Sequence, residues 1–527
     1  MSATAAGEFG LYAAADFRLA TGLCTDCPTI RQALWYFRDE TIAVPAPGRP
    51  VASFGTGVHA FEDVRRWAVA RPAGAPIDYP PLVWVAAPQV VRGARLVQDG
   101  SALATTGGEF GFRTVAKIPL NRSYFDASSA AWFAQRDVTS RGTLDAAAWV
   151  ARSLWPDDFR FGGTAPADRA LPDPSSAATS LRTLMREAPR GGAQSPYATS
   201  TLWRRDPAVT RWAGRPVLAF MVNGAQGDDD EAHGGHFAVV TGRVAGDGRI
   251  GDWLVNNYYS LDFESEKGII AAPVPLDNYL GDLNSGQGWY RPSYMVVAVL
   301  RDERACTLVQ SALNRVYNQF YRHQIEYYHP NQNCASISID TLRALGWSIP
   351  ARGASSRALA WLGFPFVAIR DRSIGKAKLA FDYLRSDQTQ LMPAASLEEA
   401  FGSLLALARG GGDPAQGALA RMLAEDVDAL AFVRFPQFPS SRVFGDAPAV
   451  TTWEYKSRVP NDPALAQIVP VPPRPFPASL HDADLLPRTW RPSDLAEIVW
   501  GALTIVGIPF VVRRLWRWRR ARRLRPG

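Results

Sequence analysis

The clearest hydrophobic pattern in the chain begins near residue 215, where short apolar runs alternate with polar, glycine-rich breaks. Runs rich in valine and aromatic residues predict strands at 216–222, 237–244, 252–259 and 294–300. Residues 306–327 repeat apolar positions every three to four residues and predict a long helix. A second helix is predicted to begin at Cys334 and to stop at Gly346. Four strands followed by two helices indicate an α+β domain over residues 201–350.

The flanking regions have weaker patterns. Residues 1–200 predict a short helix at 31–37 and strands at 82–87 and 112–118, without indicating a fold. Within this region, residues 162–200 are predicted to form a surface segment that contains one helix. Residues 351–455 form a mainly helical region, with helices predicted at 396–409 and 414–433.

The end of the chain has the pattern of a membrane anchor. Residues 456–493 are rich in proline and predict an extended tether. An apolar run at 494–512 predicts one membrane helix, followed by the arginine-rich tail 513–527. A surface-lying anchor and a buried core helix are the alternatives. The tail favours a cytoplasmic C-terminus and a main domain on the outer side, although the N-terminus has no signal-peptide pattern.

The composition excludes some classes of protein but does not indicate a function. The chain of 527 residues has a net charge of +7, and eight arginines of the tail account for it. Without the tail the protein is close to neutral, so its charge gives no case for a nucleic-acid partner. An apolar fraction of 47% excludes a disordered chain.

Four cysteines are too few for a disulfide scaffold in a chain of this length. Cys24 and Cys27 form a C-x-x-C motif that is typical of a local disulfide, two free thiols or a redox pair. No strand is predicted immediately before this motif, which disfavours a thioredoxin-like redox unit. A disulfide here would favour an oxidising compartment.

Cys334 is the strongest candidate for chemistry. It stands where the polar loop 327–333 enters a helix, in the first turn, where free N–H groups and the helix dipole stabilise a thiolate. The position therefore suits a nucleophile. The alternative is a small buried residue at the start of a helix.

A nucleophilic thiol needs a base and a group that orients it. His236 follows two glycines and leads directly into a predicted strand, which would fix its position. Asn256 and Asn257 alternate on the next strand, so only one of them can face His236, and Asn256 is slightly preferred. The oxyanion would meet the Cys334 backbone N–H and a donor from Asn333 or Tyr328.

His233 and His236 also form an H-x-x-H pair beside an acidic run, which is a rival metal-dependent hydrolase site. The segment is a glycine-rich loop instead of the helix that would place both rings on one face. We therefore expect no metal and no cofactor.

The order of these segments resembles the circularly permuted papain-like enzymes of the NlpC-like superfamily, in which the histidine strand precedes the cysteine helix. It is most similar to the bacterial branch that contains the Lnb-type lipoprotein N-acyltransferases. The matching motifs are Gly235-His236, Tyr258-Tyr259, the helix at 306–327, Tyr327-Tyr328 and Asn333-Cys334-Ala335. Ser336 and Ser338 stand where that branch often has a Thr-Arg pair.

The resemblance implies a permuted papain-like core with Cys334 as nucleophile and His236 as base. An acyl-thioester on Cys334 would be resolved by water, as in an amidase or peptidase, or by an amine, as in an acyltransferase. The predicted membrane tether and the aromatic-rich composition favour a membrane lipid or a lipid-linked envelope substrate and a bacterial inner-membrane location. The resemblance favours the periplasmic side for the catalytic domain. The non-enzymatic alternative is an inactive papain-like binding module tethered to the membrane.

Overall fold

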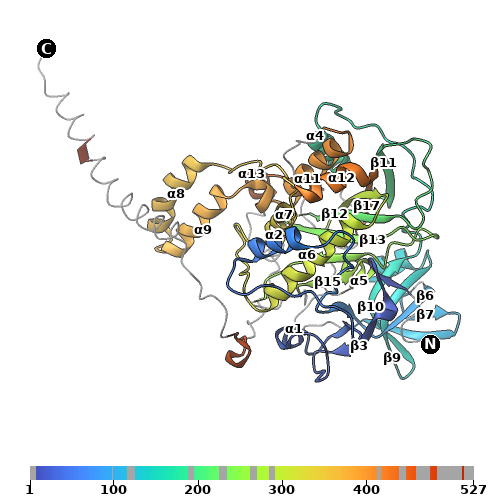
Figure 1. The fold of residues 1–527 in the computed structure, drawn as a ribbon. Coiled ribbons are helices and arrows are strands. Elements are labelled where there is room, and N and C mark those ends of the chain that lie inside the picture. Colours follow the sequence, from blue (N-terminus) through green and yellow to red (C-terminus); the bar gives the residue numbers. More distant parts are fainter. Residues whose placement is uncertain are drawn as a thin grey trace, which may run out of the picture.

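A computed structural model of the 527-residue chain describes twelve segments. They are residues 7–97, 99–114, 125–187, 195–224, 234–261, 270–283, 291–411, 417–437, 439, 447–458, 475–482 and 513–514. Within them the chain is a mixed α+β protein with several sheets, as the sequence predicted (Figure 1).

A seven-stranded antiparallel sheet forms the centre of the molecule. In spatial order its strands are β11 (Ala198–Arg204), β17 (Val427–Phe435), β16 (Ser293–Leu300), β12 (Pro216–Asn223), β13 (His236–Arg243), β14 (Leu254–Asn257) and β15 (Ala272–Pro275). Every residue of β12 and β16 is buried. Their continuous apolar runs fit strands that are covered on both faces. Because β11 and β17 belong to it, the sheet extends beyond residues 201–350 at both ends.

One face of this sheet is covered by α6 (Arg304–Tyr321), α7 (Cys334–Ala344) and α11 (Pro393–Ala408). Phe237 of β13 stacks on Phe220 of β12, and Phe220 contacts Trp347, which follows α7. These aromatic side chains therefore point toward the α7 layer. Residues directly beside them on the strands alternate to the opposite face. On that side α5 (Leu276–Gly281) contacts β14 and β15 and also packs on β10 (Ala148–Pro156).

The N-terminal region has two smaller sheets that pack below the central one in Figure 1. One is three-stranded: β3 (Phe17–Thr21), β4 (Thr41–Pro45) and β5 (Val83–Ala86). The other closes on itself: β6 (Gln89–Leu96), β7 (Ala102–Thr105), β8 (Gly108–Thr114), β9 (Val138–Asp145) and β10. A two-stranded ribbon, β1 (Glu8–Phe9) and β2 (Tyr12–Ala13), precedes them.

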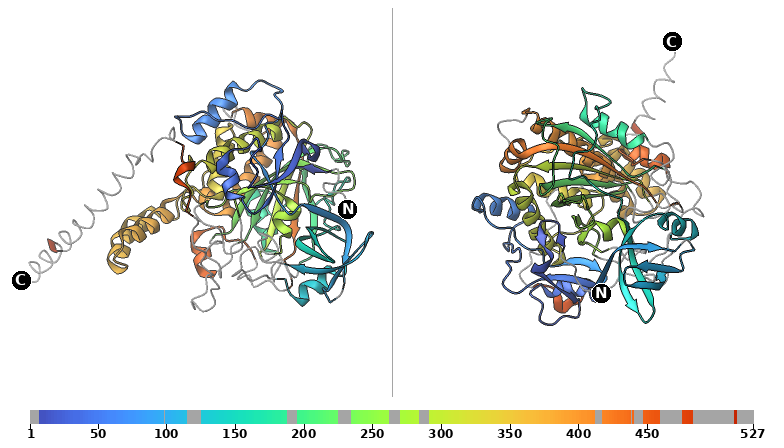
Figure 2. Two further views of the ribbon diagram at one scale, coloured as in Figure 1. Left: turned by 90° about the horizontal axis from the view of Figure 1, so that it is seen from below. Right: turned by 90° about the vertical axis from the view of Figure 1, so that its right-hand side faces the viewer.

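The remaining helices are short or peripheral. In the first half they are η1 (Ala14–Asp16), α1 (Arg31–Tyr36), α2 (Ala60–Ala70), α3 (Ala127–Phe133) and α4 (Ala177–Arg186). In the second half they are α8 (Arg357–Arg370), α9 (Ile374–Arg385), α10 (Gln388–Leu391), α12 (Ala418–Asp426), α13 (Thr452–Arg458) and η5 (Ala478–Leu480). Figure 2 shows that α8 and α9 form a hairpin that projects from the body.

The helix predicted at 414–433 is wrong in its second half. Helix α12 ends at Asp426, and Val427 already has an extended backbone. Residues 427–435 then pair with β11 on one side and β16 on the other. Alanine and leucine in this segment favour a helix, but hydrogen bonding on both sides of the strand overrides that preference. The predicted helix at 306–327 is also shorter, since α6 ends at Tyr321 and His323 has a positive φ of 57°.

The predicted tether at 456–493 is not extended throughout. Phe476 stacks on Tyr36 of α1 with ring centroids 5.7 Å apart, and Gln32 donates a hydrogen bond of 3.0 Å to the Leu480 carbonyl. This part of the proline-rich segment therefore docks on the N-terminal region. The predicted membrane helix at 494–512 lies outside the described residues. Among the helices that are described, none is both long and apolar enough to cross a bilayer.

Candidate thiol site

Cys334 is the first residue of α7, and its place is fixed by a reciprocal helix cap. The Asn333 side chain accepts hydrogen bonds from the backbone N–H groups of Ala335 (2.8 Å) and Ser336 (3.1 Å). The Ser336 hydroxyl in turn accepts a 2.6 Å hydrogen bond from the Asn333 N–H. This capping box holds the cysteine in the first turn, as the sequence predicted.

The Cys334 thiol is nearly enclosed, with 5% of the residue exposed. Burial raises the pKa of this thiol above its ordinary value. Three donors directed at Sγ oppose that effect: the backbone N–H groups of Phe237 and Ala335 and the hydroxyl of Tyr327. The net pKa stays raised, so the resting group is a neutral thiol surrounded by donors that would stabilise its thiolate.

His236 is the first residue of β13 and is 3% exposed. Gly234 and Gly235 lead into it with φ values of 107° and 88°, which favour glycine over other residues. Burial, and to a smaller extent the positive charge of Arg291, lower the pKa of the imidazole to about 3. At neutral pH the ring is therefore uncharged.

The structure brings the cysteine and the histidine segments together without bonding their side chains. His236 is in register with Asn223, and its ring lies 6.2 Å from that of Tyr279 in α5, on the face opposite α7. Nε2 of His236 has no hydrogen-bond partner among the described residues. The link to the thiol runs instead through the next residue, since the N–H of Phe237 faces Sγ.

Of the two asparagines on β14, Asn257 lies beside His236. Hydrogen bonding from its side chain raises the pKa of His236 slightly, although Asn257 Oδ1 makes no well-aligned hydrogen bond. The preferred residue, Asn256, faces the opposite side of the sheet. It exchanges two hydrogen bonds of 3.0 Å with Gln310 of α6. The structure therefore differs from the slight preference for Asn256, because alternation along β14 turns that side chain toward α6.

Neither side chain expected at the oxyanion position points there. Asn333 is used by the helix cap, and its Nδ2 donates to the His329 carbonyl at 2.7 Å. The Tyr328 hydroxyl donates to Asp382 of α9 at 2.7 Å. The neighbouring Tyr327 instead lies against both the thiol and the backbone N–H of Cys334.

Sequence reasoning missed two residues of this site. Tyr327 was visible as half of a Tyr-Tyr pair, but the sequence did not indicate which ring turns inward. Arg291 is 2% exposed and its charge lowers the pKa of both His236 and Cys334. It stands just before β16, far from both residues in sequence, so no local pattern could reveal it.

The rival metal site is only partly described, because His233 lies outside the described residues. Among the described residues, one group of three possible ligands is close enough to hold an ion: Cys24, Asp26 and Cys27. The two cysteines form a disulfide, which leaves no thiolate for a metal. The Arg18 guanidinium lies 3.6 Å from Cys24 Sγ and 3.7 Å from Cys27 Sγ.

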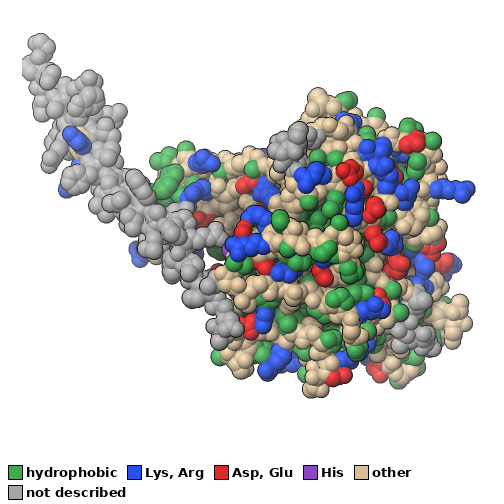
Figure 3. All heavy atoms as spheres, viewed as in Figure 1, with side chains coloured by type: hydrophobic (Ala, Val, Ile, Leu, Met, Phe, Trp, Pro, Cys, Tyr) green, Lys and Arg blue, Asp and Glu red, His purple; other side chains and the backbone are tan. Residues whose placement is uncertain are grey.

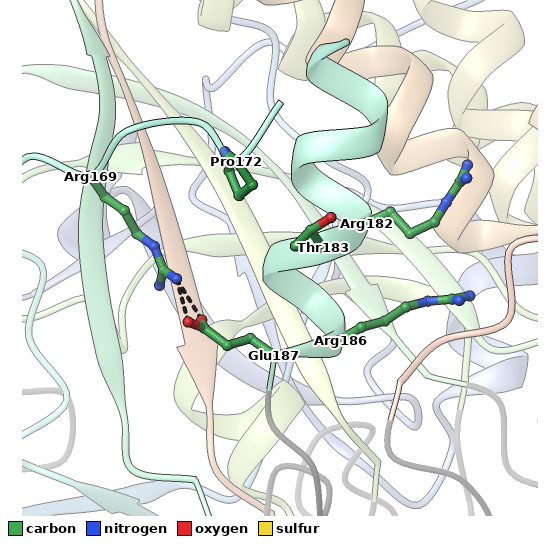
Figure 4. Close-up of a pocket in the computed structure, with 6 residues that line it drawn as sticks. All are labelled: Arg169, Pro172, Arg182, Thr183, Arg186 and Glu187. Carbon is green, nitrogen blue, oxygen red and sulfur yellow. Dashed lines mark hydrogen bonds and ion pairs between the residues drawn. The ribbon is translucent and has the colours of Figure 1, made fainter. Parts of the chain in front are cut away.

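A separate surface hollow of about 450 Å³ lies beside α4 (Figure 4). Its lining comprises Arg169, Pro172, Arg182, Thr183, Arg186 and Glu187. Each of the three arginines is paired with a carboxylate, as the dashed contacts between Arg169 and Glu187 illustrate. The hollow therefore has no unpaired arginine with which to bind an anion.

Comparisons of the chain with protein-family models, curated proteins and solved structures found no match.

Proposed function

We propose that this protein is a cysteine-dependent acyl-transfer enzyme with a permuted papain-like core. The observation that carries the proposal is the setting of Cys334. The thiol stands in the first turn of a capped helix, with the N–H groups of Phe237 and Ala335 and the Tyr327 hydroxyl directed at its sulfur. Donors in this arrangement stabilise negative charge on sulfur and on a carbonyl oxygen bound beside it.

The reaction forms one bond and breaks another at the same carbonyl carbon. Cys334 Sγ attacks the carbon, and the thiol proton passes to His236, whose ring must turn from the Tyr279 side of β13 toward α7 to receive it. The bond to the leaving amine or alcohol then breaks, and His236 returns the proton to that group. Water or a second amine attacks the thioester and releases the thiol, so the net change is hydrolysis or acyl transfer.

The pKa directions constrain how this proton moves. With the pKa of Cys334 raised and that of His236 near 3, the resting site holds a neutral thiol and a neutral imidazole. Proton transfer therefore accompanies the attack on substrate instead of preceding it. The developing thiolate would be stabilised by the N–H groups of Phe237 and Ala335 and by the Tyr327 hydroxyl.

The substrate class in this proposal is a membrane lipid or a lipid-linked envelope component, with the chain held at a bacterial inner membrane through 494–512. The Cys24–Cys27 disulfide supports a periplasmic position of the catalytic domain, since disulfides persist in oxidising compartments.

The test is acylation of the full chain by para-nitrophenyl acetate, followed by intact-mass analysis and peptide mapping. We expect one acetyl group on Cys334, none in Cys334→Ser, and slower acylation in His236→Ala. Cys306→Ser is the matched control, because Cys306 is also buried but lies in α6. It should acylate at the wild-type rate.

A second candidate is an inactive membrane-tethered binding module, which the 5% exposure and raised pKa of Cys334 favour. In that case wild type and Cys334→Ser would acylate alike, and His236→Ala would change nothing. That outcome would overturn the enzymatic proposal.

A further inference from the structure

The exposed apolar surface is concentrated in one element. Among the described residues ten large hydrophobic side chains are exposed, and seven of them lie in the α8–α9 hairpin. Leu359, Leu362, Phe366 and Ile369 recur at intervals of three and four residues, so they form one stripe along α8. Their exposed fractions are 46%, 68%, 62% and 72%, and Ile374 at the start of α9 is 68% exposed.

The exposed stripe is not the surface through which α8 packs on α9. Trp361 and Phe364 pack on Phe381 of α9, with ring centroids 4.9 Å and 6.0 Å apart. The two helices pack mainly against each other, and their far end, at the 371–373 turn, projects away from the body (Figure 1, Figure 2). Hydrophobic side chains gather along the outer edge of this hairpin in Figure 3.

Basic side chains accompany the apolar ones. Residues 357–385 hold six lysines and arginines but two aspartates. Arg370, Arg372 and Lys376 are exposed around the turn, where the adjacent acid, Asp371, is already paired with Arg370. The tip thus combines a protruding apolar surface with an excess of positive charge, a pattern typical of elements that lie in the interface of an anionic bilayer.

We propose that the α8–α9 hairpin docks on the surface of a lipid bilayer with anionic headgroups, separately from any anchor at the C-terminus. The apolar stripe enters the headgroup–acyl boundary, and Arg370, Arg372 and Lys376 contact lipid phosphates. Helix α8 has 14 residues, which suits a helix that lies in the interface instead of crossing it. The proposal rests on this surface alone and not on the thiol chemistry.

A second copy of the chain fits this surface less well. A two-fold symmetric contact with parallel stripes would bring two identical basic tips together, and like charges directly opposite one another oppose association. An antiparallel contact would leave the basic side chains of the tip out of the pairing. A bilayer with anionic lipids complements both the apolar and the basic side chains.

Docking would also orient the candidate site. Helix α9 contacts the loop before Cys334 twice: Asp382 accepts from Tyr328, and the Tyr383 hydroxyl lies 2.8 Å from His329 Nδ1. A hairpin held at the headgroups would therefore keep the loop that precedes Cys334 near the membrane.

The experiment places an environment-sensitive fluorophore on Ile369→Cys in the full chain, with unmodified protein as the labelling blank. Vesicles of phosphatidylethanolamine and phosphatidylglycerol should shift the emission to the blue. Neutral phosphatidylcholine vesicles should need at least a tenfold higher lipid concentration for the same shift. The matched control is Val69→Cys on α2, an 86% exposed position outside the hairpin, where we expect no shift. Combining Arg370→Glu, Arg372→Glu and Lys376→Glu should raise the lipid concentration needed for the emission shift at Ile369→Cys at least tenfold.

Three results would overturn the proposal. One is an unchanged Ile369→Cys probe while the protein sediments with vesicles, which would assign all membrane binding to another segment. Another is a blue shift without vesicles that grows with protein concentration, which would assign the surface to a second copy. The third is a blue shift at all dilutions without vesicles, which would show that another part of this chain already covers the stripe.

Discussion

Arg315 of α6 and Asp63 of α2 form a buried ion pair with two parallel hydrogen bonds of 2.6 and 2.7 Å. The Asp63 carboxylate also accepts from Gln319 at 2.7 Å and from the Gly55 N–H at 2.9 Å. The pair ties the N-terminal region to the helix that supports the central sheet. Because every acceptor position is used, the two charges are well compensated.

We expect Asp63→Ala to destabilise the protein by about 3–5 kcal/mol, because it leaves the Arg315 guanidinium buried without its partner. Urea unfolding at neutral pH measures the loss. The matched control is the neighbouring Glu62→Ala, since Glu62 makes only surface pairs with Arg65 and Arg66. Equal effects of the two substitutions would show that the buried pair contributes no more than a surface one.

His236 should make stability fall as the solution is acidified. Its folded-state pKa of about 3 lies below the ordinary value of 6.5, so the unfolded chain binds the proton more tightly. This contribution is complete above about pH 6.5 and is lost as the pH falls toward 3. Between pH 7 and pH 5 it amounts to about 2 kcal/mol.

Urea unfolding of wild type and His236→Gln at these two pH values tests the effect. The variant should lose less stability on acidification, while His59→Gln, at an exposed position before α2, should behave like wild type. An identical loss in wild type and His236→Gln would contradict a depressed pKa at this histidine.

Tyr327 and Tyr328 provide a matched pair of hydroxyl groups for the thiol. The Tyr327 hydroxyl lowers the pKa of Cys334, whereas that of Tyr328 donates to Asp382. Tyr327→Phe should therefore move the pH profile of iodoacetamide labelling at Cys334 to higher pH. Tyr328→Phe should leave the profile in place. If both variants shift it equally, the assignment of Tyr327 to the thiol is incorrect.

Elements with a single strong pattern could be predicted from the sequence. The Val-rich runs became β12, β13 and β16, and the Asn-Cys junction became the start of α7. The segment 427–435 could not be assigned, because its alanines and leucines suit a helix and its place between β11 and β16 depends on contacts distant in sequence. The docking of Phe476 on Tyr36 is equally nonlocal.

The candidate site also has one part that the local sequence predicted and another that depends on contacts distant in sequence. The position of Cys334 in the first turn of a helix depends on adjacent residues, so local spacing predicted it. Which asparagine of β14 lies beside His236 depends on strand register, and the contribution of Arg291 depends on how β16 is placed. A one-residue difference in register exchanges the two faces, which is why Asn256 and Asn257 could not be separated in advance.

This pair of asparagines allows orientation of His236 to be separated from stability. Asn257→Ala removes the amide beside the imidazole, so we expect acylation of Cys334 by para-nitrophenyl acetate to slow by about tenfold or more. Asn256→Ala should keep the wild-type acylation rate. It should instead destabilise the protein by about 1–3 kcal/mol, because Gln310 loses a buried partner. Stopped-flow acylation and urea unfolding of both variants measure the two effects. The reverse assignment, with slow acylation in Asn256→Ala alone, would place the orienting group on the α6 side of the sheet and remove Asn257 from the site.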